Sequence, residues 1–413
     1  MAAPPPVYLH IGAMKTGTTY LQTLMSANRE HLAADGFMVT GPKSARAVQD
    51  VLRRTRRDPR IKAESAGAWQ RTVDQLHAHT GTAAVFSMEY LSFATRTGAR
   101  RVLRSLEPAE VHVVLTVRDA LATIPAHWQT SVRNGGRVSW PNFMRGVRKT
   151  TTLQGRLGRL SPHQPVRLFS IAHGIPRILR AWGEDLPPGR LHVVTVPPPD
   201  ADPRLLWERF AAATGMDPHG CPEPPVRSNE SLGYASAEFL RRVNMELGRL
   251  RPTDYKPTVS VHLAARILAG RDESRAQTDL ATRRFAVDWN ARVRKAIRSS
   301  GAEVIGDLDD LPTELSASQS VENAGGVPEP DEREMLSAAA TALEGMQELV
   351  DRRARRLRKA GLEAPVAETV GQLSPSRWAQ SAEPVAAAAA DVAEVARTAI
   401  ELHSRLRHLP KSR

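Results

Sequence analysis

Near the start of the chain stands the segment Val7-Tyr-Leu-His-Ile-Gly12-Ala-Met-Lys15-Thr-Gly17-Thr18-Thr19. An apolar run leads here into a loop between two glycines, and apolar side chains then recur at helical spacing, at Leu21, Leu24 and Met25. Glycines allow a tight turn that points successive backbone N–H groups inward, and a helix N-terminus adds about half a positive charge. The segment therefore predicts a strand, an anion-binding loop and a helix.

The lysine of this loop differs in position from that of a nucleoside-triphosphate loop. The pattern G-x-x-x-x-G-K-[ST] has lysine after the second glycine, whereas Thr18 follows Gly17 here and Lys15 lies inside the loop. In a triphosphatase, the post-glycine lysine spans two phosphates and the next hydroxyl holds Mg²⁺. The hydroxyls of Thr18 and Thr19 suit a shorter anion, Lys15 is placed to reach the bridging oxygen of a leaving group, and no metal is required.

Short β-branched runs alternate with helical patterns over residues 1–313. Several runs are too apolar for a solvated face and are typical of buried parallel strands, so we expect an α/β three-layer sandwich around a mostly parallel sheet. Strands are predicted at Val7–Ile11, Phe37–Thr40, Ala83–Ser87, Val111–Val117, Pro165–Phe169 and Leu191–Val196. Helices are predicted at Thr18–Ala34, Ala120–Arg133, Ile175–Trp182 and Pro203–Thr214.

The composition changes after residue 313. Residues 314–334 are rich in small, polar and proline residues, which predicts a flexible linker between a P-loop domain at 1–313 and a helical C-terminal region at 335–413. Two amphipathic helices are predicted in that region, the first interrupted at Arg353. Three arrangements are open to them: pairing as an antiparallel hairpin, docking on the main domain, or binding a partner chain, which includes self-association. The Ala-rich seams of the helices favour the first two arrangements.

Composition excludes several classes of protein. The chain has 413 residues, a net charge of +13 and a single cysteine, which rules out a disulfide framework and a thiolate zinc site. The N-terminus has no signal-peptide pattern and no stretch reaches the ~18 apolar residues of a membrane span, so we expect a cytoplasmic protein. Few aromatics and no RNP-like or zinc-finger pattern argue against nucleic acid. The positive charge either concentrates a multiply anionic small molecule or reflects a biased genomic composition.

The loop from Gly12 to Thr19 resembles the 5′-phosphosulfate loop of P-loop sulfotransferases that use 3′-phosphoadenosine 5′-phosphosulfate (PAPS). Leu9-His-Ile-Gly12, Val111-His-Val-Val-Leu-Thr-Val-Arg-Asp119 and Leu191-His-Val-Val-Thr-Val-Pro-Pro198 are similar to segments of uncharacterised bacterial sulfotransferase-like proteins. The resemblance covers about residues 7–312. It implies PAPS as the cofactor, no metal, a small-molecule or carbohydrate acceptor, a catalytic role for Lys15, and cofactor contacts from Gly12, Lys15, Thr16, Gly17, Thr18 and Thr19.

A second cofactor contact is expected where a neighbouring strand ends. Arg118 follows the strand at Val111–Val117, and its planar fork of donors suits a phosphate; the resemblance assigns it the 3′-phosphate, and a strand-end salt bridge is the alternative. The family has a serine eight residues later, where this chain has Ala126. Thr130, on the same helical face, is the predicted substitute. Asp119 offers a rival interpretation as a metal carboxylate.

Sulfuryl transfer to a hydroxyl or amine requires a base. Glu89 follows the strand at Ala83–Ser87, and some carbohydrate sulfotransferases resemble this chain in having a glutamate base there. Glu89 is therefore our predicted catalytic base, with a structural carboxylate as the alternative. His10, inside an apolar strand, and His127 are competing bases that are more typical of structural histidines.

The sequence predicts a PAPS-dependent sulfotransferase whose acceptor is a sugar, a lipid, a phenol or a specialised metabolite. A P-loop kinase or NTPase is one alternative, and it would bind Mg²⁺–ATP. The other is a non-catalytic module that keeps the anion site while its C-terminal helices recruit a partner, an alternative that Ala126 supports. The segment at 226–232 either caps a helix predicted at Ala235–Leu247 or closes over the cofactor.

Overall fold

The computed structural model describes residues 4–41, 44–53, 59–149, 164–222, 231–321, 327–364 and 368–407. The chain forms two compact units, each built from separate stretches. The first, here the sheet unit, comprises Met1–Thr123, Leu168–Asn229 and Arg283–Val321; the second, the helical unit, comprises Ile124–Arg167, Glu230–Thr282 and Glu322–Arg413. Composition suggested boundaries at 313 and 335, whereas the C-terminal residues share a unit with two earlier stretches.

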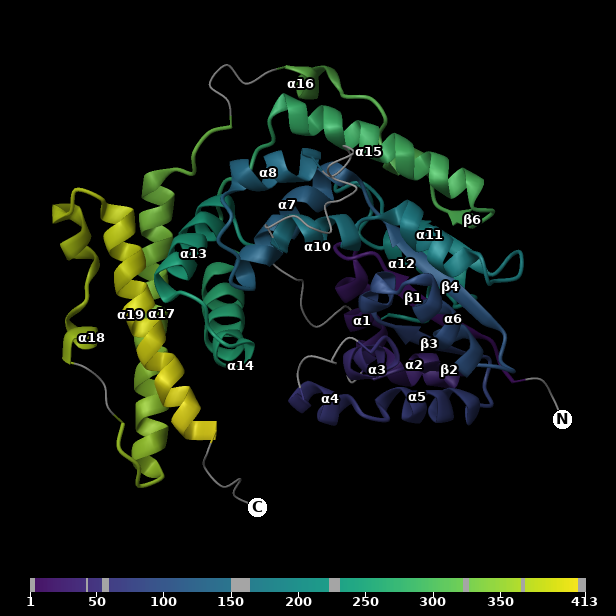
Figure 1. Cartoon of the computed structure of the whole chain (residues 1–413), viewed down its shortest axis with the longest axis horizontal. Coiled ribbons are helices and arrows are strands. Elements are labelled where there is room, and N and C mark those ends of the chain that lie inside the picture. The colour runs from purple at the N-terminus through teal and green to yellow at the C-terminus, as the bar shows by residue number, and fades with distance from the viewer. Residues whose placement is uncertain are drawn as a thin grey trace. The chain divides into compact units, whose positions relative to one another are not determined.

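The sheet unit is built on six parallel strands in the order β2-β3-β1-β4-β5-β6 (Figure 1). The predicted α/β class with a parallel sheet is confirmed, because β1 lies between β3 and β4 and every pairing is parallel. The strands are β1 (Val7–Gly12), β2 (Phe37–Val39), β3 (Ala83–Ser87), β4 (Val111–Val117), β5 (Leu191–Thr195) and β6 (Glu303–Ile305).

Two strand assignments from the sequence differ from the structure. The strand predicted at Pro165–Phe169 is wrong: the run belongs to helix α10 (Gln164–Ala172), where Phe169 and Ala172 are buried three residues apart. A proline in the first turn of a helix loses no hydrogen bond, so it does not oppose this. The edge strand β6 was missed, since three residues beginning with exposed Glu303 show no alternation.

Helices cover both faces of the sheet, as the predicted sandwich requires. Side chains alternate along the strands: Leu9 and Val113 enter one apolar layer, Val114 and Val194 the other. The first layer packs on α3 (Ser44–Val51), α5 (Ala68–His77), α6 (Arg96–Ser105), α11 (Ile175–Gly183) and α15 (Leu280–Ser299). The second packs on α1 (Thr18–Ala27), α2 (Arg29–Ala34) and α12 (Leu205–Thr214). The remaining helices of this unit are α4 (Pro59–Ser65), η1 (Glu89–Phe93), η4 (Leu308–Asp310) and α16 (Ala317–Ser320).

In the helical unit, the C-terminal helices pack on each other and on an earlier helix. α17 (Glu332–Lys359) and α19 (Pro384–Arg407) lie side by side and contact α13 (Tyr234–Leu247) (Figure 1). They run in the same direction, so they are not an antiparallel hairpin. The unit also contains α8 (Trp140–Lys149), α14 (Pro252–Tyr255), the π-helix η3 (Lys256–Leu268), α18 (Glu368–Gln372) and η5 (Pro375–Gln380); α7 (Ala120–Arg133) runs from the sheet unit into it.

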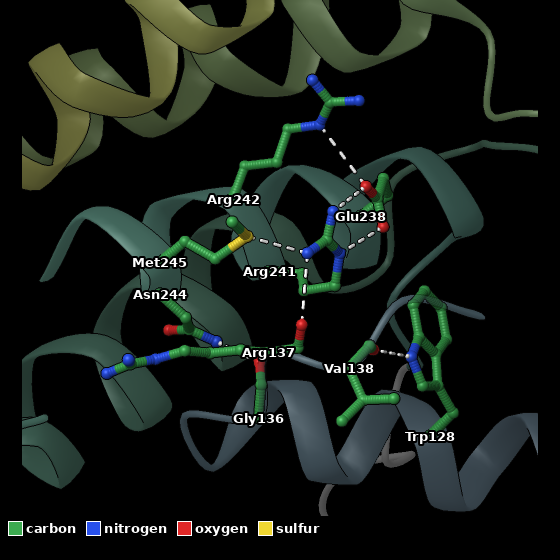
Figure 2. Close-up of polar contacts among 9 residues, drawn as sticks. All are labelled: Trp128, Gly136, Arg137, Val138, Glu238, Arg241, Arg242, Asn244 and Met245. Atoms are coloured by element: carbon green, nitrogen blue, oxygen red, sulfur yellow. Dashed lines mark hydrogen bonds and ion pairs between the residues drawn. The ribbon is translucent and has the colours of Figure 1, made fainter. Parts of the chain in front are cut away.

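Polar contacts tie α13 to the segment that follows α7 (Figure 2). The buried carboxylate of Glu238 accepts from Arg241 at 2.6 and 2.7 Å, and the same guanidinium reaches the Arg137 carbonyl at 3.2 Å. The Asn244 amide donates to the Gly136 carbonyl at 3.1 Å. These bonds satisfy buried groups of both segments and hold the loop against the helix.

The arginine that interrupts the apolar pattern of α17 is buried. Arg353 is 9% exposed and donates to the Thr258 hydroxyl at 2.8 Å and to the Ala399 carbonyl at 2.6 Å. Burial lowers the pKa of this guanidinium to about 10, so the charged form is disfavoured in the seam between η3, α17 and α19.

Replacing Arg353 with methionine is expected to stabilise the protein by about 1–3 kcal/mol, because an apolar chain of similar length removes a buried cation without leaving a cavity. Arg353→Ala removes the same charge but leaves a void, and is expected to be less stable than Arg353→Met by about 2 kcal/mol or more. Urea unfolding of both variants measures the difference. If methionine destabilises as much as alanine, the two hydrogen bonds outweigh the cost of burying the charge.

Candidate functional site

The loop between β1 and α1 contains three residues in the left-handed backbone region. Gly12 has φ 77°, Lys15 63° and Gly17 81°. The two glycines adopt this conformation without steric cost, whereas a lysine there costs about 1–2 kcal/mol. The fold therefore holds Lys15 in a conformation that it would not adopt alone, as is common in residues of ligand sites.

Several backbone N–H groups of this loop have no acceptor among the described residues. Within the described part of the chain, no acceptor is found for the N–H groups of Met14, Thr16, Gly17, Thr18 and Thr19. Gly17 is the N-cap of α1, so the positive end of the helix dipole faces the loop. Clustered donors of this kind form an anion-binding concavity.

The threonine hydroxyls of the loop are arranged differently from one another. The Thr16 hydroxyl donates to the Ala13 carbonyl at 2.6 Å and lies 2.5 Å from the Thr116 hydroxyl on β4. Thr18 is buried with its hydroxyl 3.4 Å from the Ala13 carbonyl, while Thr19 is exposed. The group that Thr16 can offer a ligand is thus its N–H, and hydroxyl donation by Thr18 and Thr19 stays a prediction.

Glu89 lies against the loop. A Cβ built on Gly12 would stand 2.7 Å from Cβ of Glu89 and 3.1 Å from its Cα, so the two backbones are in contact. The contact arises because β3 pairs directly with β1, and the Met88 N–H donates to the His10 carbonyl at 3.0 Å. Glu89 is partly buried, and the structure brings this predicted base and the loop together at the carboxyl ends of two strands.

Arg177 of α11 holds the turn that carries Glu89. Its guanidinium donates to the carbonyls of Ser92 at 2.7 Å and Ala94 at 2.9 Å, and the Ser92 hydroxyl donates to the Glu89 carbonyl at 2.7 Å. Sequence reasoning missed Arg177, because it lies 88 positions beyond Glu89 in an ordinary amphipathic helix.

Arg118 and Asp119 follow β4 and have different surroundings. Burial lowers the pKa of Arg118, and the negative charge of neighbouring Asp119 opposes this shift. In the described residues the guanidinium of Arg118 makes no hydrogen bond or close ion pair. The Asp119 carboxylate instead accepts from the Leu121 N–H at 3.1 Å and from Asn290 at 2.7 Å. Asp119 thus serves the first turn of α7, which accounts for it without a metal.

The other predicted residues lie on α7 beyond the unit boundary. The Thr130 hydroxyl donates to the Ala126 carbonyl at 2.9 Å, and its cofactor contact stays a prediction because it belongs to the helical unit. His127 is buried and stacks on Phe143, which suits a structural role. In the segment at 226–232, residues 226–230 lie outside the described residues.

His10 is a neutral, hydrogen-bonded residue of the core. It is fully buried, with Nδ1 2.8 Å from the Ser87 hydroxyl and Nε2 3.3 Å from the Thr116 hydroxyl. Burial lowers its pKa from 6.5 to about 3. The structural interpretation therefore accounts for His10 better than a role as base.

The buried imidazole predicts an acid-labile fold. Below pH 6.5 the unfolded chain binds a proton at position 10 that the native state takes up only near pH 3, so stability falls as the pH is lowered through this window. At pH 5 the expected loss is about 2 kcal/mol. Urea unfolding at pH 7 and pH 5 measures it, with His10→Gln as the non-titrating reference. Equal losses in the two proteins would contradict this assignment.

Two other kinds of feature, metal sites and membrane spans, concern the described residues as well. No group of three or more His, Cys, Asp or Glu side chains is placed to hold a metal ion there. Among the same residues no helix is both long and apolar enough to cross a membrane.

Comparison with known proteins adds little to the geometry. No family model matches the chain, and no curated protein matches it. Among solved structures, a sulfotransferase from Alicyclobacillus acidocaldarius is similar over 55% of this chain and 87% of its own, with 14% identity and a TM-score of 0.39. A likeness at this level carries no argument about function.

Proposed function

We propose that the chain is a sulfotransferase that takes the sulfuryl group of PAPS to a hydroxyl or amine of a small-molecule or carbohydrate acceptor. One observation carries the proposal: the Cα and Cβ of Glu89 lie against Gly12, in a loop that has an internal lysine and several N–H groups without an acceptor among the described residues. A donor loop alone binds many anions. A neighbouring base and an internal lysine suit a reaction in which a group leaves a bound phosphate.

Each residue has a role in this proposal. The loop N–H groups hold the 5′-phosphosulfate and Arg118 the 3′-phosphate. Glu89 takes the proton of the acceptor hydroxyl or amine, which makes the acceptor atom nucleophilic. Lys15 neutralises the charge that develops on the departing phosphate oxygen. PAPS, when bound, supplies the sulfuryl group, and the product is adenosine 3′,5′-bisphosphate (PAP).

Calorimetric titration tests the proposal without knowledge of the acceptor. PAP is expected to bind, and ATP to bind more weakly both with and without Mg²⁺. Binding of Mg²⁺–ATP alone would move the assignment to a kinase or NTPase. Binding of neither nucleotide would favour the non-catalytic module.

Glu89→Gln is expected to keep PAP affinity within about threefold and to lower turnover by about 10²–10⁴-fold, because the amide retains the shape of the carboxylate but accepts no proton. Release of PAP and sulfate from PAPS, with water as the acceptor, supplies the rate. Glu64→Gln, at an exposed glutamate of α4, is the control. An unchanged rate in Glu89→Gln would remove this residue as the base.

A further inference from the structure

A continuous chain of hydrogen bonds lies beneath the loop between β1 and α1, here called the anion loop. It begins at Gln22 of α1, whose amide donates to the Ser87 hydroxyl at 3.2 Å and to the Ser87 carbonyl at 3.1 Å. It passes through His10 of β1, with Ser87 at 2.8 Å and Thr116 at 3.3 Å. It ends at Thr16, which lies 2.5 Å from Thr116 and 2.6 Å from the Ala13 carbonyl.

The bond between Thr16 and the Ala13 carbonyl decides which group donates and which accepts in each bond from Thr16 back to His10. A carbonyl oxygen only accepts, so the Thr16 hydroxyl donates its hydrogen bond to the Ala13 carbonyl. The short contact between Thr16 and Thr116 then requires the Thr116 hydroxyl to donate, because two oxygens with no hydrogen between them would repel. Because the Thr116 hydroxyl has only one hydrogen and donates it to Thr16, the Thr116 oxygen must be the acceptor in its contact with His10. The donor in that contact is Nε2–H of His10.

The other ring nitrogen completes the chain. Burial lowers the pKa of His10 to about 3, so the ring carries one proton at neutral pH, and that proton is on Nε2. Nδ1 is then an acceptor and receives a hydrogen bond from the Ser87 hydroxyl, whose oxygen accepts from the Gln22 amide. Each buried donor and acceptor of the chain is satisfied in this one arrangement.

The end of the chain determines the orientation of a peptide group in the loop. A trans peptide points its C=O and its N–H to opposite sides. When the Thr16 hydroxyl holds the Ala13 carbonyl, the Met14 N–H is turned away from these buried hydroxyls. The Ala13 N–H is also held, by the Thr116 carbonyl at 2.8 Å. Met14 N–H is one of the free donors described above.

We propose that His10, as the Nε2–H tautomer, is a positioning residue that acts through Thr116 and Thr16 to aim the Met14 N–H at the 5′ anion. The inference rests on the proposed function, since it assumes that the loop binds the 5′ group of PAPS. It gives a sequence-distant residue, Thr116, a measurable effect on cofactor affinity without contact with the cofactor.

The tautomer is tested by nitrogen-15 NMR of the histidine rings, with His10→Gln to assign the signal. The expected result at neutral pH is a neutral ring with its proton on Nε2. Thr116→Val removes the acceptor of that proton and is expected to shift the His10 signals, whereas Thr116→Ser restores them. A charged ring, or a proton on Nδ1, would overturn the arrangement.

Affinity is tested by calorimetric titration of PAP into the full-length chain and three variants. Thr116→Val is expected to bind about tenfold more weakly or worse, and Thr116→Ser to stay within about threefold of the wild type. Thr195→Val is the matched control: Thr195 is a buried threonine at the end of β5 whose hydroxyl bonds Asp310 at 2.7 Å and belongs to no chain under the loop. Its PAP affinity is expected to match the wild type.

The outcomes separate the inference from the proposed function. If the wild type binds PAP but Thr116→Val binds it as tightly as Thr195→Val does, the positioning role is wrong and the proposed function stands. If both valine variants lose affinity equally, the effect is general destabilisation and the inference is also wrong. If the wild type binds no PAP, the proposed function fails, and the inference fails with it.

Discussion

Arg118→Met is expected to weaken PAP binding by about 100-fold while raising the thermal stability of the protein. The affinity falls because the partly buried guanidinium, which has no acceptor among the described residues, is assigned to the 3′-phosphate. The stability rises because burial already disfavours the charged form of Arg118, and methionine removes that cost. Opposite changes in binding and stability are typical of a residue kept for a ligand.

Calorimetry and thermal unfolding of the same preparations measure both effects. Arg118→Lys keeps the charge but not the planar fork, so an intermediate affinity is expected. Arg190→Met is the control: this arginine is in the same unit, immediately before β5, and pairs with Glu110 at 3.4 Å. Loss of stability without loss of affinity in Arg118→Met would make Arg118 a structural residue and refute its assignment to the cofactor.

Gly12→Ala is expected to destabilise the sheet unit by about 2–4 kcal/mol and to abolish PAP binding. Two separate costs contribute. Gly12 has φ 77°, which disfavours any side chain, and a Cβ there would stand 2.7 Å from Cβ of Glu89. Because that neighbour includes backbone, 3.1 Å away at the Glu89 Cα, the clash cannot be relieved by rotating a side chain.

Gly189→Ala separates the two costs. Gly189 has φ 78° but nothing within 4 Å of its Cβ position, so its substitution measures the backbone cost alone, about 1 kcal/mol. Urea unfolding at neutral pH compares the two variants. A Gly12→Ala protein no less stable than Gly189→Ala would mean that Glu89 does not lie against the loop, and the proposed base would lose its geometric support.

Much of the sheet was predictable from local patterns. β1, β3 and β4 are mostly buried, and buried strands consist largely of apolar residues. These apolar runs can be recognised in the sequence. The strand predicted at Pro165–Phe169 failed because a short apolar run fits a buried helix equally well. The division into two units was not visible, since contacts between residues distant in sequence decide which stretches pack together.

The candidate site divides in the same way. Gly12, Lys15 and Gly17 belong to one strand–loop–helix segment, so their spacing alone indicated an anion loop. Glu89 and Arg118 were found because each follows a strand, and the carboxyl ends of parallel strands meet at one edge. The structure shows different kinds of evidence for their nearness to the loop. Glu89 lies directly against Gly12, whereas the position of Arg118 near the loop follows from the pairing of β4 with β1.

The amino-acid sequence alone determined that a strand, a loop with a lysine between two glycines and a helix follow one another, because these are local features. Only the tertiary structure decided what supports that loop. Thr116 and Ser87 are common residues inside strands, and nothing local distinguishes them from other threonines and serines. They join His10 in one hydrogen-bond chain because β3 and β4 pair on either side of β1 and bring residues 77 and 106 positions from His10 within bonding distance.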